Sequence, residues 1–125
     1  MLEFYEKDDH SGVVSIYDHH ITINKTLLKY CNEAYRIRLA VDQEEQKVYI
    51  YMINKDYALS GELKESSLLK ISLSKTYARI CSQSVIRYLC RTFGFSIDKN
   101  KYRRYHAWYD EAHKAIIVDM KGEMK

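Results

Sequence analysis

The residues best suited to binding chemistry are cations, and they gather in the second half of the chain. Residues 99–104 form a basic run with a tyrosine inside it, and three arginines precede that run: Arg79, Arg87 and Arg91. Acidic residues gather elsewhere, in residues 3–9, 42–45 and 62–65. The formal net charge of +3 is small, but its uneven distribution predicts that a polyanionic partner meets the second half first.

Such cations can neutralise phosphates and give an affinity for DNA that falls as salt rises. The candidate DNA-binding residues are Lys25, Lys29, Lys75, Arg79, Arg87, Arg91, Lys99, Lys101, Arg103 and Arg104, with Arg36 and Arg38 as further cations in the first half. A charged surface that only contacts solvent is the alternative interpretation. The sequence by itself leaves both open.

Histidine and cysteine patterns point to neither metal binding nor catalysis. His19 and His20 are adjacent, so in an extended chain they face opposite ways, and the other histidines have no ligand-type spacing with them. The cysteines, Cys31, Cys81 and Cys90, lack metal-type spacing and are expected to pack as small hydrophobes in a reducing compartment. We expect no cofactor and no metal.

An enzymatic function is not expected either. The chain has no glycine-rich phosphate loop, no nucleophile elbow and no His-Glu-x-x-His motif. Asp110, Glu111 and His113 fall in a predicted hairpin turn, where polar residues are common in any protein. No small-molecule substrate can be identified from these patterns, although a small hydrolase or nuclease with an unrecognised site stays as a minor alternative.

Twelve tyrosines are the other conspicuous feature of the composition. Several lie in alternating segments, among them Tyr49, Tyr51, Tyr105 and Tyr109, together with Trp108. Strands favour aromatic residues in any case, oligomer interfaces are rich in tyrosine, and aromatic rings can stack on the bases of single strands. We rank these interpretations in that order and expect the protein to form a homo-oligomer.

Length and composition are those of one small globular domain. The chain has 125 residues, of which 46% are hydrophobic and 30% charged, as in ordinary soluble proteins. No run of about 18 apolar residues occurs, so no membrane span is expected. The N-terminus is acidic where a signal peptide would be basic and then apolar. We therefore expect a cytoplasmic protein.

Periodicity predicts hairpins joined by short helices. Period-two alternation in residues 14–17 and 21–23 indicates a hairpin, and Asn24 is suited to cap a helix over residues 25–31. A longer hairpin is predicted for the segments 35–41 and 48–52. The second half repeats the order, with strands at 69–73 and 79–81, a helix at 85–93 capped by Ser82 or Ser84 and ended by Gly94, and a hairpin at 105–109 and 115–118.

This order suggests an internal duplication. Residues 21–31 are echoed by residues 79–89, where a short β-type run precedes a polar Asn or Ser, an apolar pair, a cation and a tyrosine. The predicted fold is mainly β with short helices (α+β), formed by two tandem ββαββ units in a small barrel-like domain. The expected boundaries are an N-terminal segment 1–11, unit 1 at 12–53, a linker at 54–67 and unit 2 at 68–122. Chance similarity is the alternative.

The second unit resembles the swapped-hairpin fold of the SpoVT/AbrB-type regulators. In that family the core reads roughly Asp-x-x-Gly-Arg-hydrophobic-x-Ile-Pro, followed by a helix with a Leu-Arg-Arg-type sequence. Arg79 falls on the family arginine, Ile80 on the hydrophobic position and Arg87 on the first helix arginine. The departures from the pattern are Lys75, Ala78, Ser82 and Gln83. Two such units in one chain are similar in arrangement to the MraZ family.

The resemblance implies interleaved hairpins and an oligomer that binds DNA through arginines of the hairpin and the helix start. It makes the chain a candidate bacterial transcription regulator of the AbrB-like type. The competing interpretation is a protein-interaction or assembly module, without enzymatic activity, that kept the fold and lost the DNA surface. The first unit lacks the family arginine, so any DNA contact is expected to be asymmetric or to have been lost.

Overall fold

Alternating apolar residues form the first hairpin, as the sequence predicted. The computed structural model describes residues 1–4 and 11–124. In it β1 (Gly12–Tyr17) pairs antiparallel with β2 (His20–Asn24). Val14 and Ile16 on β1, and Ile21 and Ile23 on β2, are all 2% exposed or less. The residues between them in the sequence therefore face outward.

A short helical segment follows this hairpin. It consists of the α-helix α1 (Lys25–Leu28) and the 3₁₀ turn η1 (Lys29–Cys31). Asn24 occupies the N-cap position but makes no side-chain cap bond. Its Oδ1 instead accepts from the Val13 backbone N–H at 3.0 Å, and its Nδ2 donates to the Ser11 carbonyl at 3.0 Å. Asn24 therefore ties the helix start to β1 rather than capping the helix.

The long hairpin predicted for the first half is confirmed. Strand β3 (Arg36–Asp42) pairs with β4 (Lys47–Ile53) through seven consecutive residue pairs. The polar segment that follows, residues 54–67, contains two short helical turns, α2 (Lys55–Ala58) and η2 (Glu65–Ser67). Neither turn contains a buried residue.

The strand predicted for residues 69–73 is shorter than expected. Only β5 (Ser72–Leu73) pairs with the next strand, β6 (Tyr77–Cys81). Leu69 makes an isolated antiparallel bridge to Ile37 of β3, with N–H···O distances of 2.9 and 2.8 Å. Most of the strand predicted for residues 69–73 therefore has no ladder partner among the described residues.

The second helix and the last hairpin complete the chain. Helix α3 (Gln83–Phe93) is capped by Ser82, whose Oγ accepts from the Val85 N–H, and ends at Gly94 in the left-handed conformation with φ 71°. It is followed by β7 (Tyr102–Asp110) and β8 (Ala115–Met124). The basic run at 99–104 was expected as a loop, but residues 102–104 belong to β7 because they pair with β1.

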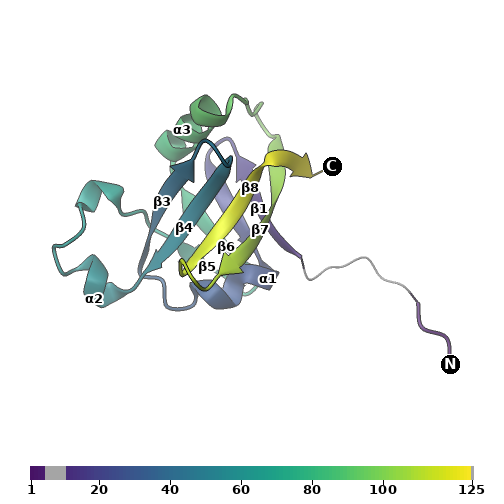
Figure 1. Ribbon diagram of the computed structural model, residues 1–125, viewed down its shortest axis with the longest axis horizontal. Helices are drawn as coiled ribbons and strands as arrows, with labels where there is room; N and C mark the ends of the chain where they lie inside the picture. The colour runs from purple at the N-terminus through teal and green to yellow at the C-terminus, as the bar shows by residue number, and fades with distance from the viewer. Residues whose placement is uncertain (5–10, 125) are drawn as a thin grey trace.

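All eight strands form one antiparallel sheet that curls into a half-barrel (Figure 1). Their order across the sheet is β3-β4-β8-β7-β1-β2-β6-β5. Three of these pairings join the first half of the chain to the second: β1 with β7, β2 with β6 and β4 with β8. The fold is mainly β with a few short helices, as expected.

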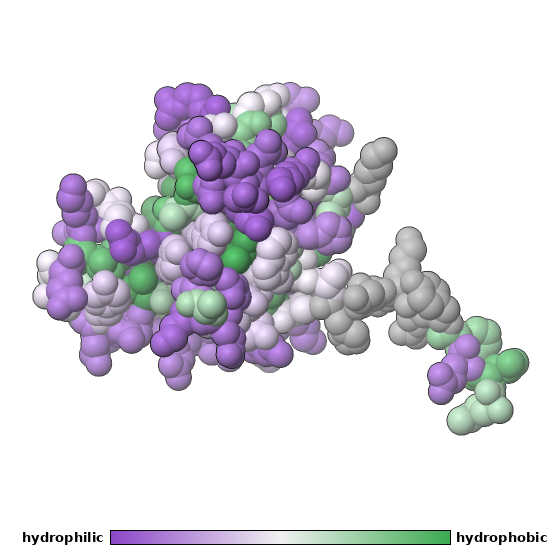
Figure 2. Space-filling model, in the orientation of Figure 1, coloured by the Kyte–Doolittle hydropathy of each residue, from purple (hydrophilic) through white to green (hydrophobic). Residues whose placement is uncertain are grey.

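The apolar core lies on the concave side of the curled sheet. Leu27 and Cys31 of the α1–η1 segment pack into it, and so do Ile86 and Leu89 of α3. Figure 1 shows α3 at one end of the sheet and α1 at the other. Residues 1–4 extend away from this body, with the apolar side chains of Met1, Leu2 and Phe4 exposed (Figure 2). Within the described residues, none of the helices is both long and apolar enough to cross a membrane.

Candidate nucleic-acid interface

A row of polar residues crosses five adjacent strands on the outer face of the sheet. Arg104 of β7 lies opposite Ser15 of β1, and Ser15 lies opposite Thr22 of β2. Thr22 in turn lies opposite Arg79 of β6, which lies opposite Ser72 of β5. The residues next to the row on β1, β2 and β6, and Tyr105 on β7, are buried, so the row faces away from the core on these four strands. Both residues of β5 are exposed. Two arginines thus share one surface with three hydroxyl groups.

Mostly aromatic and polar residues, with one valine, flank this row on the same strands. They are Tyr102, His106, Val13, Tyr17, His20, Asn24, Tyr77 and Cys81. None of these positions carries a carboxylate. We refer to the row and these neighbours as the outer face. Guanidinium groups beside aromatic rings are typical of surfaces that bind nucleic acids.

Arg79 lies at the edge of a hollow in the outer face. The hollow has a volume of about 430 Å³ and is lined by Tyr17, His20, Thr22, Asn24, Thr76, Tyr77 and Arg79. The Arg79 Nη2 donates to the Tyr77 hydroxyl at 3.4 Å, and the guanidinium carbon lies 5.4 Å from the centre of the Tyr77 ring. The Arg79 Nε is buried without a hydrogen-bond partner. The N–H group at Arg79 Nε is therefore a buried donor that makes no hydrogen bond.

Three rings lie together on the outer face, at the end where β1 turns into β2. Tyr17 stacks on His20 with a centroid distance of 4.4 Å and lies 5.1 Å from the ring of Tyr102. Burial lowers the pKa of His20 below its usual value of 6.5, and the positive charge of Arg79 lowers it further. The imidazole is therefore held neutral near pH 7, where it can act as a flat, uncharged stacking surface.

Three of the candidate lysines lie at the margins of the outer face. Lys25 directly follows Asn24, and Lys75 comes two residues before Tyr77, which is the partner of Asn24 across the β2–β6 ladder. Lys101 directly precedes Tyr102 at the other end. All three lysines are exposed. Together with Arg79 and Arg104, five of the ten candidate cations therefore lie on the outer face or beside it.

A second group of candidate cations lines a groove at α3. Arg87 and Arg91 of the helix and Arg103 of β7 border it. Arg103 is already engaged, since it donates to the Ser96 carbonyl at 2.9 Å and pairs with Glu123 at 2.8 Å. Its guanidinium also lies 5.4 Å from the Phe95 ring centre. Arg103 thus fastens the loop after α3 to the sheet.

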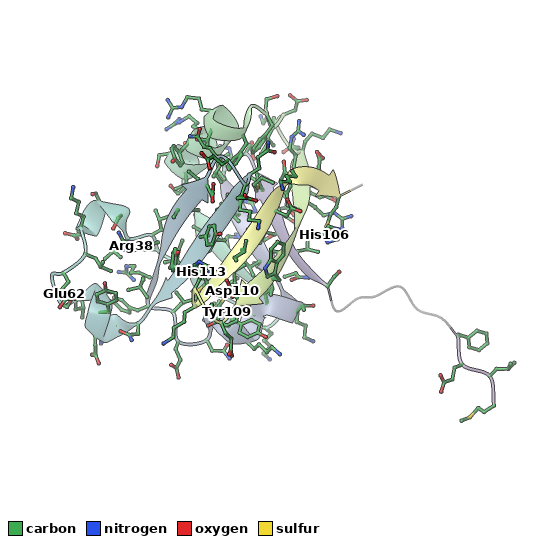
Figure 3. The ribbon with its side chains drawn as sticks, viewed as in Figure 1. Arg38, Glu62, His106, Tyr109, Asp110 and His113 are labelled. Atoms are coloured by element: carbon green, nitrogen blue, oxygen red, sulfur yellow. The ribbon has the colours of Figure 1, made fainter. Side chains whose placement is uncertain are left out.

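The remaining cations are separate from both surfaces. Lys29 lies over the ring of its neighbour Tyr30, and Lys99 is exposed in the turn before β7. Arg36 donates to the Tyr35 carbonyl at 2.8 Å. Arg38 lies on β3 opposite Tyr51 of β4, on the part of the sheet seen in Figure 3. The basic residues therefore do not form one continuous positive surface.

Histidines do not gather into one site. His113 contacts the carboxylate of Asp110 in the β7–β8 turn, and this hydrogen bond lowers the pKa of Asp110. Tyr109 is next to this pair, whereas His106 lies apart from it (Figure 3). The pair is on the surface, and no described cavity includes it. The described residues contain no group of three or more metal-ligating side chains close enough to share an ion.

The cysteines differ in burial more than the sequence suggested. Cys31 is buried as expected, and burial raises the pKa of its thiol to about 11. Cys90 is half-buried, and burial raises its pKa as well. Cys81 is exposed, contrary to expectation, because it is the last residue of β6 and falls on the outward side of that strand.

Sequence reasoning identified the arginines of the outer face but missed its other members. Ser15 and Thr22 gave no chemical signal, and Tyr17 and His20 were read only as strand or turn residues. The alternation of β1 and β2 did place Ser15, Tyr17 and Thr22 on the outward side, whereas His20 was assigned to the turn. Their association with Arg79 and Arg104 depends on the β2–β6 and β1–β7 pairings, which local patterns do not specify.

Comparison of the chain with models of protein families, with curated proteins and with solved structures found no match.

Proposed function

We propose that the protein binds DNA through the outer face, as an oligomeric, AbrB-like regulator of tandem swapped-hairpin type. The observation that carries this proposal is the five-strand row from Arg104 to Ser72, which aligns two guanidinium groups with three hydroxyls at strand positions that carry no carboxylate. Such groups are the usual donors to backbone phosphates. Base contacts need not accompany them.

The state of Arg79 supports this proposal. A buried donor without a partner costs free energy in the isolated protein. A phosphate oxygen in the adjacent hollow would provide a charge-assisted partner for it. Tyr17, His20 and Tyr77 border the hollow. A DNA backbone bound there would therefore contact aromatic rings instead of bulk water.

The strand pairings also support the tandem swapped-hairpin arrangement. If β1–β4 are exchanged with β5–β8 in order, the β2–β6 and β4–β8 pairings map onto themselves, and the hairpins of one half map onto those of the other. The β1–β7 pairing maps onto contact between β5 and β3. Its counterpart is the bridge from Leu69, just before β5, to Ile37. This symmetry is what an internal duplication would produce.

If the two halves are a duplication, the hairpin register and the outward direction of the side chains indicate which residues correspond. Ser15 lies opposite Thr22 in the first hairpin, and Ser72 lies opposite Arg79 in the second. Thr22 is therefore the counterpart of Arg79. The sequence alignment had paired Arg79 with Ile21, which is buried, whereas Arg79 faces outward. The strands of the repeat must be shifted by one residue from that alignment.

This correspondence keeps the proposed DNA contact asymmetric. Thr22 and Arg79 face each other across the β2–β6 ladder, so the pseudo-two-fold axis passes beside them and only one side has a cation. Arg87, which the sequence grouped with Arg79, lines the α3 groove instead. We therefore assign the main contacts to Arg79 and Arg104, with Lys25, Lys75 and Lys101 at the margins.

The test is a binding titration on mixed duplex fragments at two salt concentrations. The double variant Arg79→Gln with Arg104→Gln should bind more weakly on all fragments. Its log–log salt slope should be smaller by about two, since each lost phosphate contact removes about one. The matched control is Arg36→Gln with Arg38→Gln, which removes the same charge away from the outer face. Equal losses in both variants would contradict the assigned site.

A protein-interaction module is the second candidate function. It is favoured by a second aromatic surface, where Tyr49 of β4 lies opposite Ile117 of β8, and Ile117 lies opposite Trp108 of β7. Trp108 is 41% exposed, and Tyr51 lies 6.3 Å from Tyr49 between ring centres. No binding of the wild-type protein to DNA at low salt would favour this module over the DNA-binding proposal.

A further inference from the structure

The groove at α3 combines an apolar floor with a cationic rim. It has a volume of about 940 Å³ and lies between α3, the loop after it and β7. Its apolar lining comes from Ile86, Cys90, Phe95 and Ile97. Ile86 is 4% exposed, and the other three are half-buried. This volume is within the range of small-molecule sites, which are mostly apolar with a few polar groups.

The rim carries positive charge that the described residues do not neutralise. Arg87 and Arg91 are four residues apart on α3, so they project from the same side of the helix. Both are exposed, and neither has an ion-pair partner within the described part of the chain. Arg103 is paired with Glu123, and Asp18, which also lines the groove, lies 3.3 Å from His19. The two helix arginines remain the unpaired cations.

The walls of the groove are held in place. Arg103 fixes the Phe95–Ser96 loop through its bond to the Ser96 carbonyl and its position over the Phe95 ring. On the other side, the Gln83 Nε2 lies 2.7 Å from the His19 Nδ1, which ties the β1–β2 turn to the start of α3. A preformed groove loses less entropy when a ligand binds than a flexible surface does.

We propose that this groove binds a small organic anion with an apolar body, such as a medium-chain or aromatic carboxylate. The hydrocarbon part contacts Phe95, Ile97 and Cys90. The anionic group contacts Arg87 and Arg91, whose planar guanidinium groups suit a carboxylate. The carboxylate of Asp18, which also lines the groove, disfavours an anionic group placed beside it.

This proposal is independent of DNA binding. The groove and the hollow of Arg79 have no lining residue in common. They lie near each other only at the β1–β2 turn, where Asp18 borders the groove and Tyr17 borders the hollow. Loss of DNA binding in the outer-face variant would therefore leave the ligand test unaffected.

The experiment compares three probes by calorimetry, each below its aggregation concentration. Decanoate has both the charge and the tail, decanol has the tail alone, and acetate has the charge alone. Decanoate should bind at least about tenfold more tightly than either of the others, since a hydrogen bond to a charged group and a buried chain each contribute that much. Chemical-shift changes of backbone amides should centre on residues 94–97.

Variants separate the groove from general attraction. Arg87→Gln with Arg91→Gln should weaken decanoate binding about tenfold or more. Both side chains are exposed, so the fold should be retained. Lys55→Gln with Lys64→Gln removes the same charge from exposed positions outside the groove and should have no effect. Equal binding of decanoate and decanol, or decanoate binding that survives the arginine changes, would overturn the proposal.

Discussion

Gly12 is the residue at which the fold leaves least room. A Cβ built on it would lie 2.2 Å from the Ala107 carbonyl oxygen and 2.8 Å from the Leu27 Cδ1. The contact with Ala107 is to backbone, so it can be relieved only by moving β1 away from β7. Close packing of this kind explains a glycine at the start of a buried strand.

Replacing Gly12 with Ala should therefore destabilise the protein. Overpacking that shifts backbone typically costs about 1–3 kcal/mol, and urea unfolding measures the change. Gly122→Ala is the matched control, because it is also in a strand but a Cβ there meets nothing within 4 Å. Similar destabilisation by both substitutions would mean that lost glycine flexibility, rather than the close approach, is responsible.

His20 offers a residue-level test of the outer face. Its folded-state pKa is lowered, so the unfolded chain binds a proton more readily. Stability from the neutral imidazole is present above the unfolded pKa of about 6.5 and is lost as pH falls through the lower folded pKa. Removing the charge of Arg79, the second cause of the shift, should raise the His20 pKa without restoring it fully, since burial is the larger cause.

The measurement is an NMR titration of the His20 ring protons in the wild-type protein and in Arg79→Gln. Arg38→Gln is the control, because Arg38 lies on β3, away from the β2–β6 ladder. An unchanged His20 pKa in Arg79→Gln would contradict the electrostatic effect of Arg79 on the His20 ring.

At the scale of elements, helix α3 shows how much local sequence can determine. The sequence left two residues, Ser82 and Ser84, as alternative N-caps, and it correctly placed the end of the helix at Gly94. The Ser82 Oγ accepts from the Val85 N–H at 3.3 Å, whereas Ser84 contacts only the Ser82 hydroxyl at 3.1 Å. Both the cap and the glycine stop are local signals, so they could be read without a fold.

Ser82→Ala should accordingly destabilise the protein by about 1 kcal/mol, the usual cost of losing an N-cap. Ser84→Ala should change stability by much less, because Ser84 makes no bond to a helix N–H. Thermal or urea unfolding of the two variants side by side gives the comparison. A larger loss of stability in Ser84→Ala than in Ser82→Ala would show that Ser82 is not the N-cap.

Strand partners, by contrast, could not be read from local patterns. The alternation of residues 36–42 and 47–53 predicted a hairpin that exists, because the two strands are joined by a short turn. Tyr102 and Arg104 were assigned to a loop because their pairing with β1 spans most of the chain. The same long-range pairing assembles the outer face, so the candidate cations could be named in advance but not grouped.

At the scale of the whole molecule, interleaving of the halves limits how the chain can fold. Strands β1, β2 and β4 each have a neighbour in the second half of the chain. Each half would leave those strand edges and their apolar faces unpaired, and such edges favour association. The halves therefore depend on each other for a complete core.

The aromatic surface around Trp108 bears on the oligomeric state. Trp108 is 41% exposed on β7, next to Ile117, which is 5% exposed, and Lys47 lies 5.9 Å from its ring centre. A large aromatic side chain beside an apolar residue is typical of the centre of a protein interface. We expect the protein to form at least a dimer, with this surface in the interface.

Trp108→Lys should then weaken self-association by about tenfold or more, because aromatic residues at interface centres commonly contribute at least 2 kcal/mol. Tyr102→Lys is the matched control, since Tyr102 is 51% exposed on the same strand but belongs to the outer face. Sedimentation velocity over a range of concentrations measures both. A wild-type protein that stays monomeric at high concentration would contradict the expected dimer, whereas weakening by Tyr102→Lys alone would move the interface to the outer face and compete with DNA binding there.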